Sequence, residues 1–183
     1  HFLNKANLRA GESLLVIGAA GAVGSAMVQL ARHRGAHVTA VCSTANMAWV
    51  RALGASQVID YTQEDFTQNG QTYHVIMDTV GTAPFSRCQA SLRDGGRLLL
   101  VLAWLADMLH APWASLTSGK KVIAGPVSVR AEDLPLLAEL AATGAFKAVI
   151  DRRYRFEQMV EAHRYVDSGR KKGNVVVMLG YED

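Results

Sequence analysis

The chain alternates between short continuous apolar runs and segments in which apolar residues recur at helical spacing. The run at residues 13–18 (SLLVIG) is typical of a strand buried on both faces. Residues 22–34 then place apolar side chains on one helical stripe and end at Gly35, a common C-terminal stop. The same alternation predicts strands at residues 13–18, 37–42, 56–60, 74–80, 97–103, 120–127, 147–151 and 174–179. It predicts helices at residues 22–34, 47–53, 85–92, 131–143 and 156–167.

Strands and helices that alternate at these lengths predict an α/β fold, a doubly wound parallel sheet with right-handed crossovers and helices on both faces. The chain has 183 residues, enough for one domain with a substantial core. Residues 104–119, which include Trp104 and Trp113, fit neither pattern. We expect them to form a long irregular segment at an interface or a functional element.

Composition narrows the class of partner. Half of the residues are hydrophobic and 19% are charged, the balance of a folded globular chain. The formal net charge of +3 is mild and the basic run is confined to residues 170–172, so nucleic-acid binding is not expected. The longest apolar run, residues 98–106, is too short to span a bilayer, and the first ten residues lack a signal-peptide pattern. The isolated Cys42 and Cys88 are expected to be reduced core thiols in a cytoplasmic protein without a membrane partner.

The stretch GAAGAVG at residues 18–24 joins the first predicted strand to the first predicted helix. Small residues leave backbone N–H groups bare at a helix N-terminus, where these groups and the helix dipole favour a phosphate. Gly21 would let a pyrophosphate approach the main chain, and Gly24 would let the helix pack on the strand. Because the motif follows a buried strand and opens a helix, it predicts dinucleotide binding rather than a plain helix contact.

Two other enzyme classes with similar turns fit less well. A short-chain dehydrogenase spaces its glycines differently and needs a Tyr-x-x-x-Lys pair, which none of the tyrosines of this chain has. A methyltransferase usually has an acidic residue at the end of the second strand, and this chain has none there.

No acidic residue occurs between Glu12 and Asp60, although a carboxylate about twenty residues after the glycines would bind the ribose hydroxyls of NAD. The expected position falls on residues 42–44. A carboxylate ~4 Å from the 2′-phosphate of NADP would cost on the order of 4 kcal/mol at an effective dielectric of 20, so its absence favours NADP. Hydroxyl, amide and guanidinium donors follow in its place. The groups expected to bind that phosphate are Ser43, Thr44, Asn46 and Arg51.

Five stretches of the chain carry a resemblance to a known family. They are LRAGESLLVIGAAGAVGSAMVQLARHRGAHVTAVCST, RALGASQVIDYT, HVIMDTVG, SLRDGGRLLLV and EAHRYVDSGRKKGNVVVML. They follow the family order over nearly the whole chain. On these motifs the sequence resembles the medium-chain dehydrogenase/reductase superfamily, in its branch of quinone-oxidoreductase-like and zinc-type alcohol dehydrogenase-like proteins.

The resemblance implies a six-stranded Rossmann sheet of order 3-2-1-4-5-6 and hydride transfer from NADPH to a carbonyl, enone or quinone. It also implies that Tyr61 lies at the 2′-phosphate end, and that residues 80–81 and 102–103 border the nicotinamide. Relatives often carry Lys where this chain has Asn46, so Arg51 is expected to supply the positive charge. The expected cofactor-binding residues are Ala20, Gly21, Ala22, Val23, Ser43, Thr44, Asn46, Arg51, Tyr61, Val80, Gly81, Leu102 and Ala103.

Members of this superfamily begin with a catalytic domain, whereas this sequence starts just before the first Rossmann strand. We therefore expect residues 1–150 to form a dinucleotide-binding domain, and residues 151–183 to form a return segment that packs toward a catalytic domain outside these residues. The six histidines are dispersed without ligand spacing, so no zinc site is expected in the chain and no residue is assigned a catalytic role. The chain by itself is expected to bind NADPH without efficient turnover.

Two expectations concern assembly and the class of function. Apolar residues over 98–113 predict a surface patch that supports a homodimer, as the late strands do in relatives. The alternative to an oxidoreductase is a non-enzymatic nucleotide-binding or sensor module, because a fold does not by itself determine function.

Overall fold

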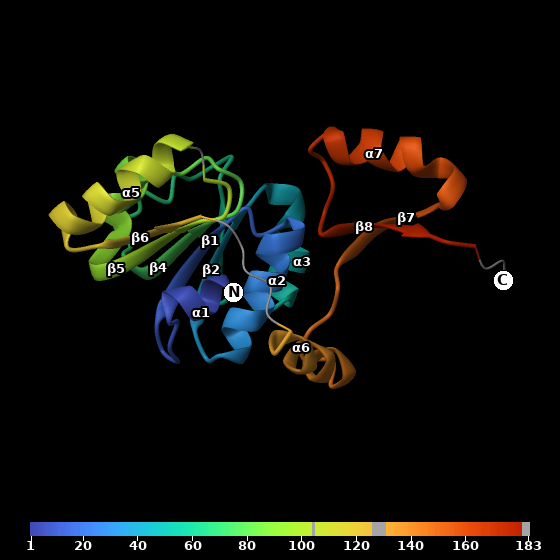
Figure 1. Cartoon of the computed structure of the whole chain (residues 1–183), viewed down its shortest axis with the longest axis horizontal. Coiled ribbons are helices and arrows are strands. Elements are labelled where there is room, and N and C mark those ends of the chain that lie inside the picture. Colours follow the sequence, from blue (N-terminus) through green and yellow to red (C-terminus); the bar gives the residue numbers. More distant parts are fainter. Residues whose placement is uncertain (104, 126–130, 181–183) are drawn as a thin grey trace.

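A six-stranded parallel sheet of order β3-β2-β1-β4-β5-β6 forms the centre of the fold (Figure 1). The computed structural model describes residues 1–103, 105–125 and 131–180. The strand order and the parallel pairing confirm the predicted doubly wound Rossmann architecture. The strands of this sheet are β1 (Ser13–Ile17), β2 (His37–Cys42), β3 (Gln57–Asp60), β4 (Tyr73–Asp78), β5 (Leu92–Leu100) and β6 (Lys121–Ala124).

Helices cover both faces of the sheet, and a second, two-stranded sheet with one helix between its strands follows later in the chain (Figure 1). The helices are α1 (Phe2–Ala6), α2 (Ala22–His33), α3 (Met47–Ala52), α4 (Phe85–Cys88), α5 (Leu105–Ser118), α6 (Asp133–Ala142) and α7 (Met159–Asp167). Short 3-10 turns lie at Thr44–Asn46, Gln89–Ser91 and Phe156–Gln158. The second sheet pairs β7 (Ile150–Arg155) with β8 (Asn174–Met178) in parallel.

The central strand β1 is buried on both sides because helices pack on each face. Leu14 and Val16 belong to the cluster that includes α2 residues such as Val28. Leu15 and Ile17 belong to the opposite cluster, which α4 and α5 complete. Successive side chains of a strand point to opposite faces, so a continuous apolar run is what this position requires.

The expectation of an irregular segment at 104–119 is wrong, because Leu105–Ser118 forms α5. Small residues face the sheet: Ala111 and Ala114 are buried, whereas Trp113 and Leu116 are 70% and 85% exposed. The large apolar residues Trp113 and Leu116 are thus exposed, and small residues line the buried face. The spacing of large apolar residues therefore does not show the helical period of α5. Trp104 lies outside the described residues.

The prediction of an apolar surface patch over residues 98–113 is also wrong for the first residues of that range. Leu98, Leu99 and Leu100 are buried in the core. The strand that contains them begins at Leu92 and ends at Leu100, earlier at both ends than predicted. Its pairing with β4 shifts register between Tyr73 and Val75, so residues 93–96 form an irregularity inside the strand rather than a separate turn.

Most other boundaries agree with prediction to within a few residues. The helix α1 was not predicted, and the strand expected at 147–151 is displaced to Ile150–Arg155. The last two residues of the strand expected at 120–127 fall outside the described part of the chain. None of the helices in the described part has both the length and the apolar character that a bilayer crossing requires.

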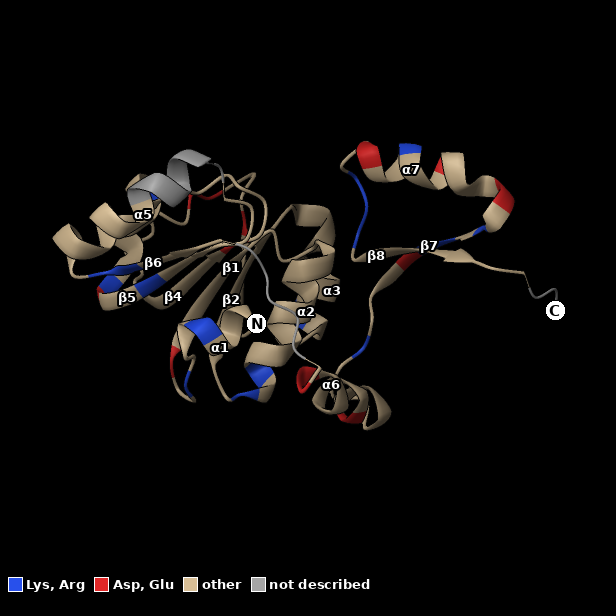
Figure 2. Ribbon diagram, in the orientation of Figure 1, with Lys and Arg blue, Asp and Glu red and all other residues tan. Residues whose placement is uncertain are grey.

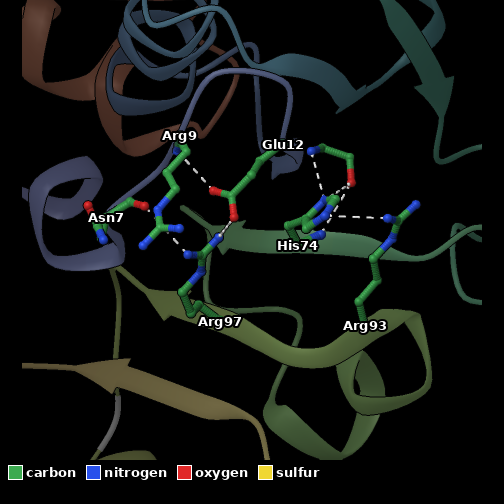
Figure 3. Close-up of polar contacts among 7 residues, drawn as sticks. Asn7, Arg9, Glu12, His74, Arg93 and Arg97 are labelled. Carbon is green, nitrogen blue, oxygen red and sulfur yellow. Dashed lines mark hydrogen bonds and ion pairs between the residues drawn. The ribbon is translucent and has the colours of Figure 1, made fainter.

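The starts of β1, β4 and β5 meet in a polar cluster at the opposite edge from the glycine turn (Figure 3). The Arg97 guanidinium donates to Glu12 Oε1 at 2.7 Å, and the Arg9 backbone N–H donates to Glu12 Oε2 at 2.9 Å. Ser13 donates its backbone N–H to Nδ1 of His74 at 3.0 Å. Burial raises the pKa of Glu12, but the Arg9 N–H and the Arg97 guanidinium outweigh burial and hold that pKa below its usual value. The cluster ties strand starts together and is a structural feature.

Gln29 fastens the segment that follows α6 to the Rossmann helix α2. Its side-chain amide donates to the Lys147 carbonyl at 3.0 Å, and its side-chain oxygen accepts the Lys147 N–H at 2.8 Å. Gln29 is buried, so both backbone groups of Lys147 depend on it for hydrogen bonds away from water. Beyond this anchor a cleft of about 480 Å³ separates α2 from β7 and β8.

Replacing Gln29 with Leu tests this anchor. The Q29L variant loses three side-chain hydrogen bonds, one to the Ser25 carbonyl and two to Lys147, and leaves both backbone groups of Lys147 unsatisfied. The free energy of unfolding is therefore expected to fall by about 2 kcal/mol. Urea unfolding measures this loss, and faster hydrogen exchange at the Lys147 amide localises it. The control is Gln68→Leu at an exposed loop position, expected within about 0.5 kcal/mol of the parent. Equal stability of Q29L and the parent would contradict the anchoring role.

Candidate functional site

The residues predicted to bind a cofactor lie along one edge of the six-stranded sheet, because parallel strands end at the same edge. Each of β1 to β5 is followed there by between one and four of the predicted residues. Four of the exposed large apolar side chains of the molecule are among them. Those four are Val23, Tyr61, Val80 and Leu102. The predicted cofactor-binding residues therefore lie on one partly apolar surface at this edge of the sheet. Rossmann-type folds bind nucleotides at this edge.

Three glycines shape the turn after β1, each for a different reason. Gly18 has φ +79, and a Cβ there would come within 2.5 Å of Val80 Cγ1. A Cβ on Gly24 would lie 2.2 Å from the Gly18 carbonyl oxygen, so α2 packs directly on the turn. At Gly21 the nearest atom to such a Cβ is 3.4 Å away, so protein packing does not require glycine there. Because packing within the protein does not explain a glycine at position 21, the approach of a pyrophosphate to the main chain is a fitting explanation for it.

The last part of the chain returns to this turn. The Gly173 N–H donates to the Ala20 carbonyl at 2.8 Å, and Gly173 pairs with Gly21 in an isolated bridge. The Lys171 ammonium donates to the Gly173 carbonyl at 2.9 Å. Figure 2 shows basic residues in the connection from α7 to β8, which contains the run at 170–172. Sequence analysis noted that basic run but could not place it beside the glycine turn.

The segment after β2 holds an ordered set of polar groups. Asn46 donates its side-chain amide to Ser43 Oγ at 3.0 Å and accepts the Trp49 indole N–H at 3.0 Å. Ser43 Oγ therefore accepts one hydrogen bond and keeps its own proton for a ligand. The guanidinium of Arg51, on α3, has no hydrogen bond or ion pair with any described residue.

A buried carboxylate that sequence analysis did not assign lies beside these groups. Asp60, at the end of β3, pairs in register with Cys42 at the end of β2. It accepts a hydrogen bond from Thr44 Oγ1, and two more from Thr62. The Thr44 hydroxyl bond, outweighing burial, holds the pKa of Asp60 below its usual value. Nothing in the local sequence pattern marks Asp60 as a neighbour of Thr44, because strand register brings the two together.

Asp78 shapes the other end of the edge. Its carboxylate is buried at the end of β4 and accepts the N–H groups of Val80, Gly81 and Ala83 at 2.9, 3.0 and 2.7 Å. These bonds hold the loop that was predicted to border the nicotinamide ribose. The signal in the sequence is an Asp two residues before the predicted loop, a pattern typical of Asx turns.

Leu102 and Ala103 follow β5 rather than end it, since the strand stops at Leu100.

Cys42 and Cys88 are buried and form no disulfide. Burial, with a contribution from Asp60, raises the pKa of Cys42 to about 11. Burial, with a contribution from Asp78, raises the pKa of Cys88 to about 12. Neither thiol is therefore a reactive thiolate at neutral pH.

A Rossmann-type dinucleotide-binding domain is the class that this fold and edge define. A family model described as "Zinc-binding dehydrogenase" matches residues 53–177. The chain belongs to this family, within the medium-chain dehydrogenase/reductase superfamily, and corresponds to its NAD(P)-binding domain. In the described part of the chain no three His, Cys, Asp or Glu side chains come together as a metal-ligand set, so these residues do not fit a zinc site.

Relatives agree with this assignment. The chain is 31% identical over 179 residues to "2-methylene-furan-3-one reductase" of Solanum lycopersicum, covering 96% of this chain and 42% of that protein. It is 28% identical over 179 residues to "NADPH-dependent alkenal/one oxidoreductase, chloroplastic" of Arabidopsis thaliana, with the same coverage. The solved quinone oxidoreductase from Coxiella burnetii superposes with a TM-score of 0.86 at 25% identity, covering 97% of this chain and 56% of that one. The chain thus spans about half the length of the relatives it matches.

Two glycine substitutions separate packing from ligand binding. Gly24→Ala is expected to lower the free energy of unfolding by about 1–3 kcal/mol, because its methyl group collides with backbone. Gly21→Ala is expected to keep stability within about 1 kcal/mol while weakening NADPH binding about tenfold, because its methyl group occupies the pyrophosphate approach. Urea unfolding and calorimetric titration measure the two effects. Unchanged affinity in G21A would contradict the placement of the pyrophosphate.

Proposed function

We propose that this chain binds NADP(H) as the cofactor domain of an oxidoreductase that reduces a carbonyl, enone or quinone. The observation that carries the proposal is that Gly21, at the start of α2, is a glycine that protein packing does not require, because a Cβ there would meet no atom closer than 3.4 Å. The names of the relatives support the reaction class, since one is an NADPH-dependent alkenal/one oxidoreductase and another a quinone oxidoreductase. A bound reduced nicotinamide would supply hydride to an electrophilic carbon of the substrate.

The residues of this chain would bind and orient that cofactor. Backbone groups of Ala20, Gly21, Ala22 and Val23 would hold the pyrophosphate at the positive end of α2. The loop that Asp78 fixes would present Val80 and Gly81 to the nicotinamide ribose, and Leu102 and Ala103 would border the ring. No residue of the chain is proposed to be catalytic.

The preference for NADP over NAD rests on the groups that follow β2. Ser43 has a hydroxyl proton to donate, and Arg51 has an uncommitted guanidinium. Both suit a phosphate, which only accepts hydrogen bonds. Asn46 holds Ser43 in place, and the exposed ring of Tyr61 lies at the same end of the edge. Thr44 contributes less than expected because its hydroxyl already donates to Asp60.

The return segment is proposed to belong with a neighbouring domain. Within the described residues β7 and β8 pair only with each other, although β8 carries three consecutive valines that are only half-buried. Two exposed strands with an apolar face are not stable alone in water. We propose that residues 151–183 pack on a catalytic domain, which would also cover the hydride site.

A homodimer through the β6 edge is a further part of the proposal. β6 ends the sheet, and the nearby helix α5 exposes Trp113 and Leu116. No strand in the described part of the chain pairs with the outer side of β6, and a strand edge beside exposed large apolar side chains favours pairing with a second copy. The cytoplasmic location remains a prediction.

Replacing Ser43 with Ala tests the phosphate site. S43A is expected to weaken NADPH binding about tenfold and NADH binding less than about twofold, because the lost donor faces the 2′-phosphate. Trp49, which bonds to Asn46, is an intrinsic fluorescence reporter at this end of the site. The control is Ser56→Ala, an exposed residue before β3. An equal loss of both cofactors would contradict the assignment.

The 183 residues alone are expected to bind NADPH but to reduce enones and quinones at no more than trivial rates, because no partner domain orients the substrate. Absorbance of NADPH at saturating cofactor measures the rate, with a full-length quinone oxidoreductase as the positive control. Turnover of about 1 s⁻¹ or more, the range of ordinary enzymes, would refute this expectation.

A further inference from the structure

The structure places a carboxylate at the ribose end of the site, although the strand that usually supplies it has none. β2 ends at Cys42, and neither Cys42 nor the following Ser43 and Thr44 is acidic. The pairing of β2 with β3 sets Cys42 beside Asp60, and the Tyr61 N–H donates to the Cys42 carbonyl at 3.2 Å. Asp60 thereby reaches the Thr44 side chain from the neighbouring strand.

Asp60 carries a charge that only neutral groups compensate. Its Oδ1 accepts the Thr62 N–H at 2.9 Å and the Thr62 hydroxyl at 2.8 Å. Its Oδ2 accepts the Thr44 hydroxyl. Asp60 is 8% exposed, and no Lys or Arg among the described residues forms an ion pair with it. The negative charge therefore has little exposed surface, and no cation in the described part of the chain pairs with it.

The two hydroxyls after β2 have opposite roles because of this carboxylate. A hydroxyl has one proton to donate. Thr44 gives its proton to Asp60, so its oxygen can only accept from a ligand, as from a ribose hydroxyl. Ser43 accepts from Asn46 and can donate, as to a phosphate. One group thus suits the 2′-hydroxyl of NADH and the other suits the 2′-phosphate of NADPH.

We propose that Asp60 is a specificity-determining residue that limits the preference for NADPH over NADH by retaining the Thr44 hydroxyl proton and opposing the 2′-phosphate. The inference rests on the proposed function, since it places the adenosine ribose at the end of β2. Asp60 acts through Thr44 and through its charge rather than by contacting the reacting atoms.

The test is Asp60→Asn with binding of NADPH and NADH measured by calorimetry. The amide N–H of the new side chain can donate to Thr44 Oγ1, which frees the Thr44 proton for the phosphate, and the opposing charge is gone. NADPH affinity is expected to rise about tenfold while NADH affinity changes less than about twofold. Parallel changes in both affinities, or none, would overturn the inference.

Asp65→Asn is the matched control. Asp65 Oδ1 accepts the N–H and the hydroxyl of Thr67, both at 2.9 Å, in the same Asp-x-Thr turn that Asp60 forms with Thr62. D65N removes the same charge from the chain but has no contact with Thr44. It is expected to leave the ratio of the two affinities unchanged. If D65N changed the ratio of NADPH to NADH affinity as much as D60N does, the effect would come from the net charge of the chain, and the inference would be overturned.

A double variant that also replaces Thr44 separates the effect of the Thr44 proton from the effect of the Asp60 charge. In Thr44→Val there is no hydroxyl proton to release, so adding D60N is expected to produce a smaller gain in NADPH affinity, about threefold, from the charge alone. The full tenfold gain in this background would overturn the role of Thr44. If the unmodified chain binds neither cofactor, the proposed function itself is wrong. If it binds both and D60N leaves their ratio unchanged, only the Asp60 inference fails.

Discussion

The contact between the start of α2 and the turn after β1 is the constraint on which the rest of the structure depends. The backbone of Gly24 packs so closely on Gly18 and Ala19 that a single methyl group would not fit. This contact directs the first turn of α2, with its free N–H groups, toward the carboxyl edge of the sheet. Every other part of the proposed site is arranged around that point.

Side-chain carboxylates organise both ends of this edge through hydrogen bonds within the protein. Asp78 gathers three backbone N–H groups into the loop that would meet the nicotinamide ribose. Asp60 gathers Thr44 and Thr62 at the end where the adenosine is proposed to lie. Each saturates its oxygens with neutral donors, which is how a buried charge is tolerated when no cation is near. The geometry of the edge thus depends on polar groups behind it as much as on those that face a cofactor.

The return segment connects the glycine turn to the remainder of the chain. Gln29 bonds both backbone groups of Lys147, and Gly173 bonds the Ala20 carbonyl. A shift of β7 and β8 would therefore be transmitted to the turn that is proposed to hold the pyrophosphate.

The sequence alone determined the order of strands and helices, the parallel sheet and the glycine turn, because each depends on local periodicity and on small residues at set positions. It failed at α5, where Ala111 and Ala114 rather than larger residues face the sheet. Tertiary structure alone decided that Asp60 reaches Thr44 and that Gly173 reaches the glycine turn. Both are contacts between residues far apart in the chain, fixed by strand register and by the path of the return segment, and no local pattern encodes either.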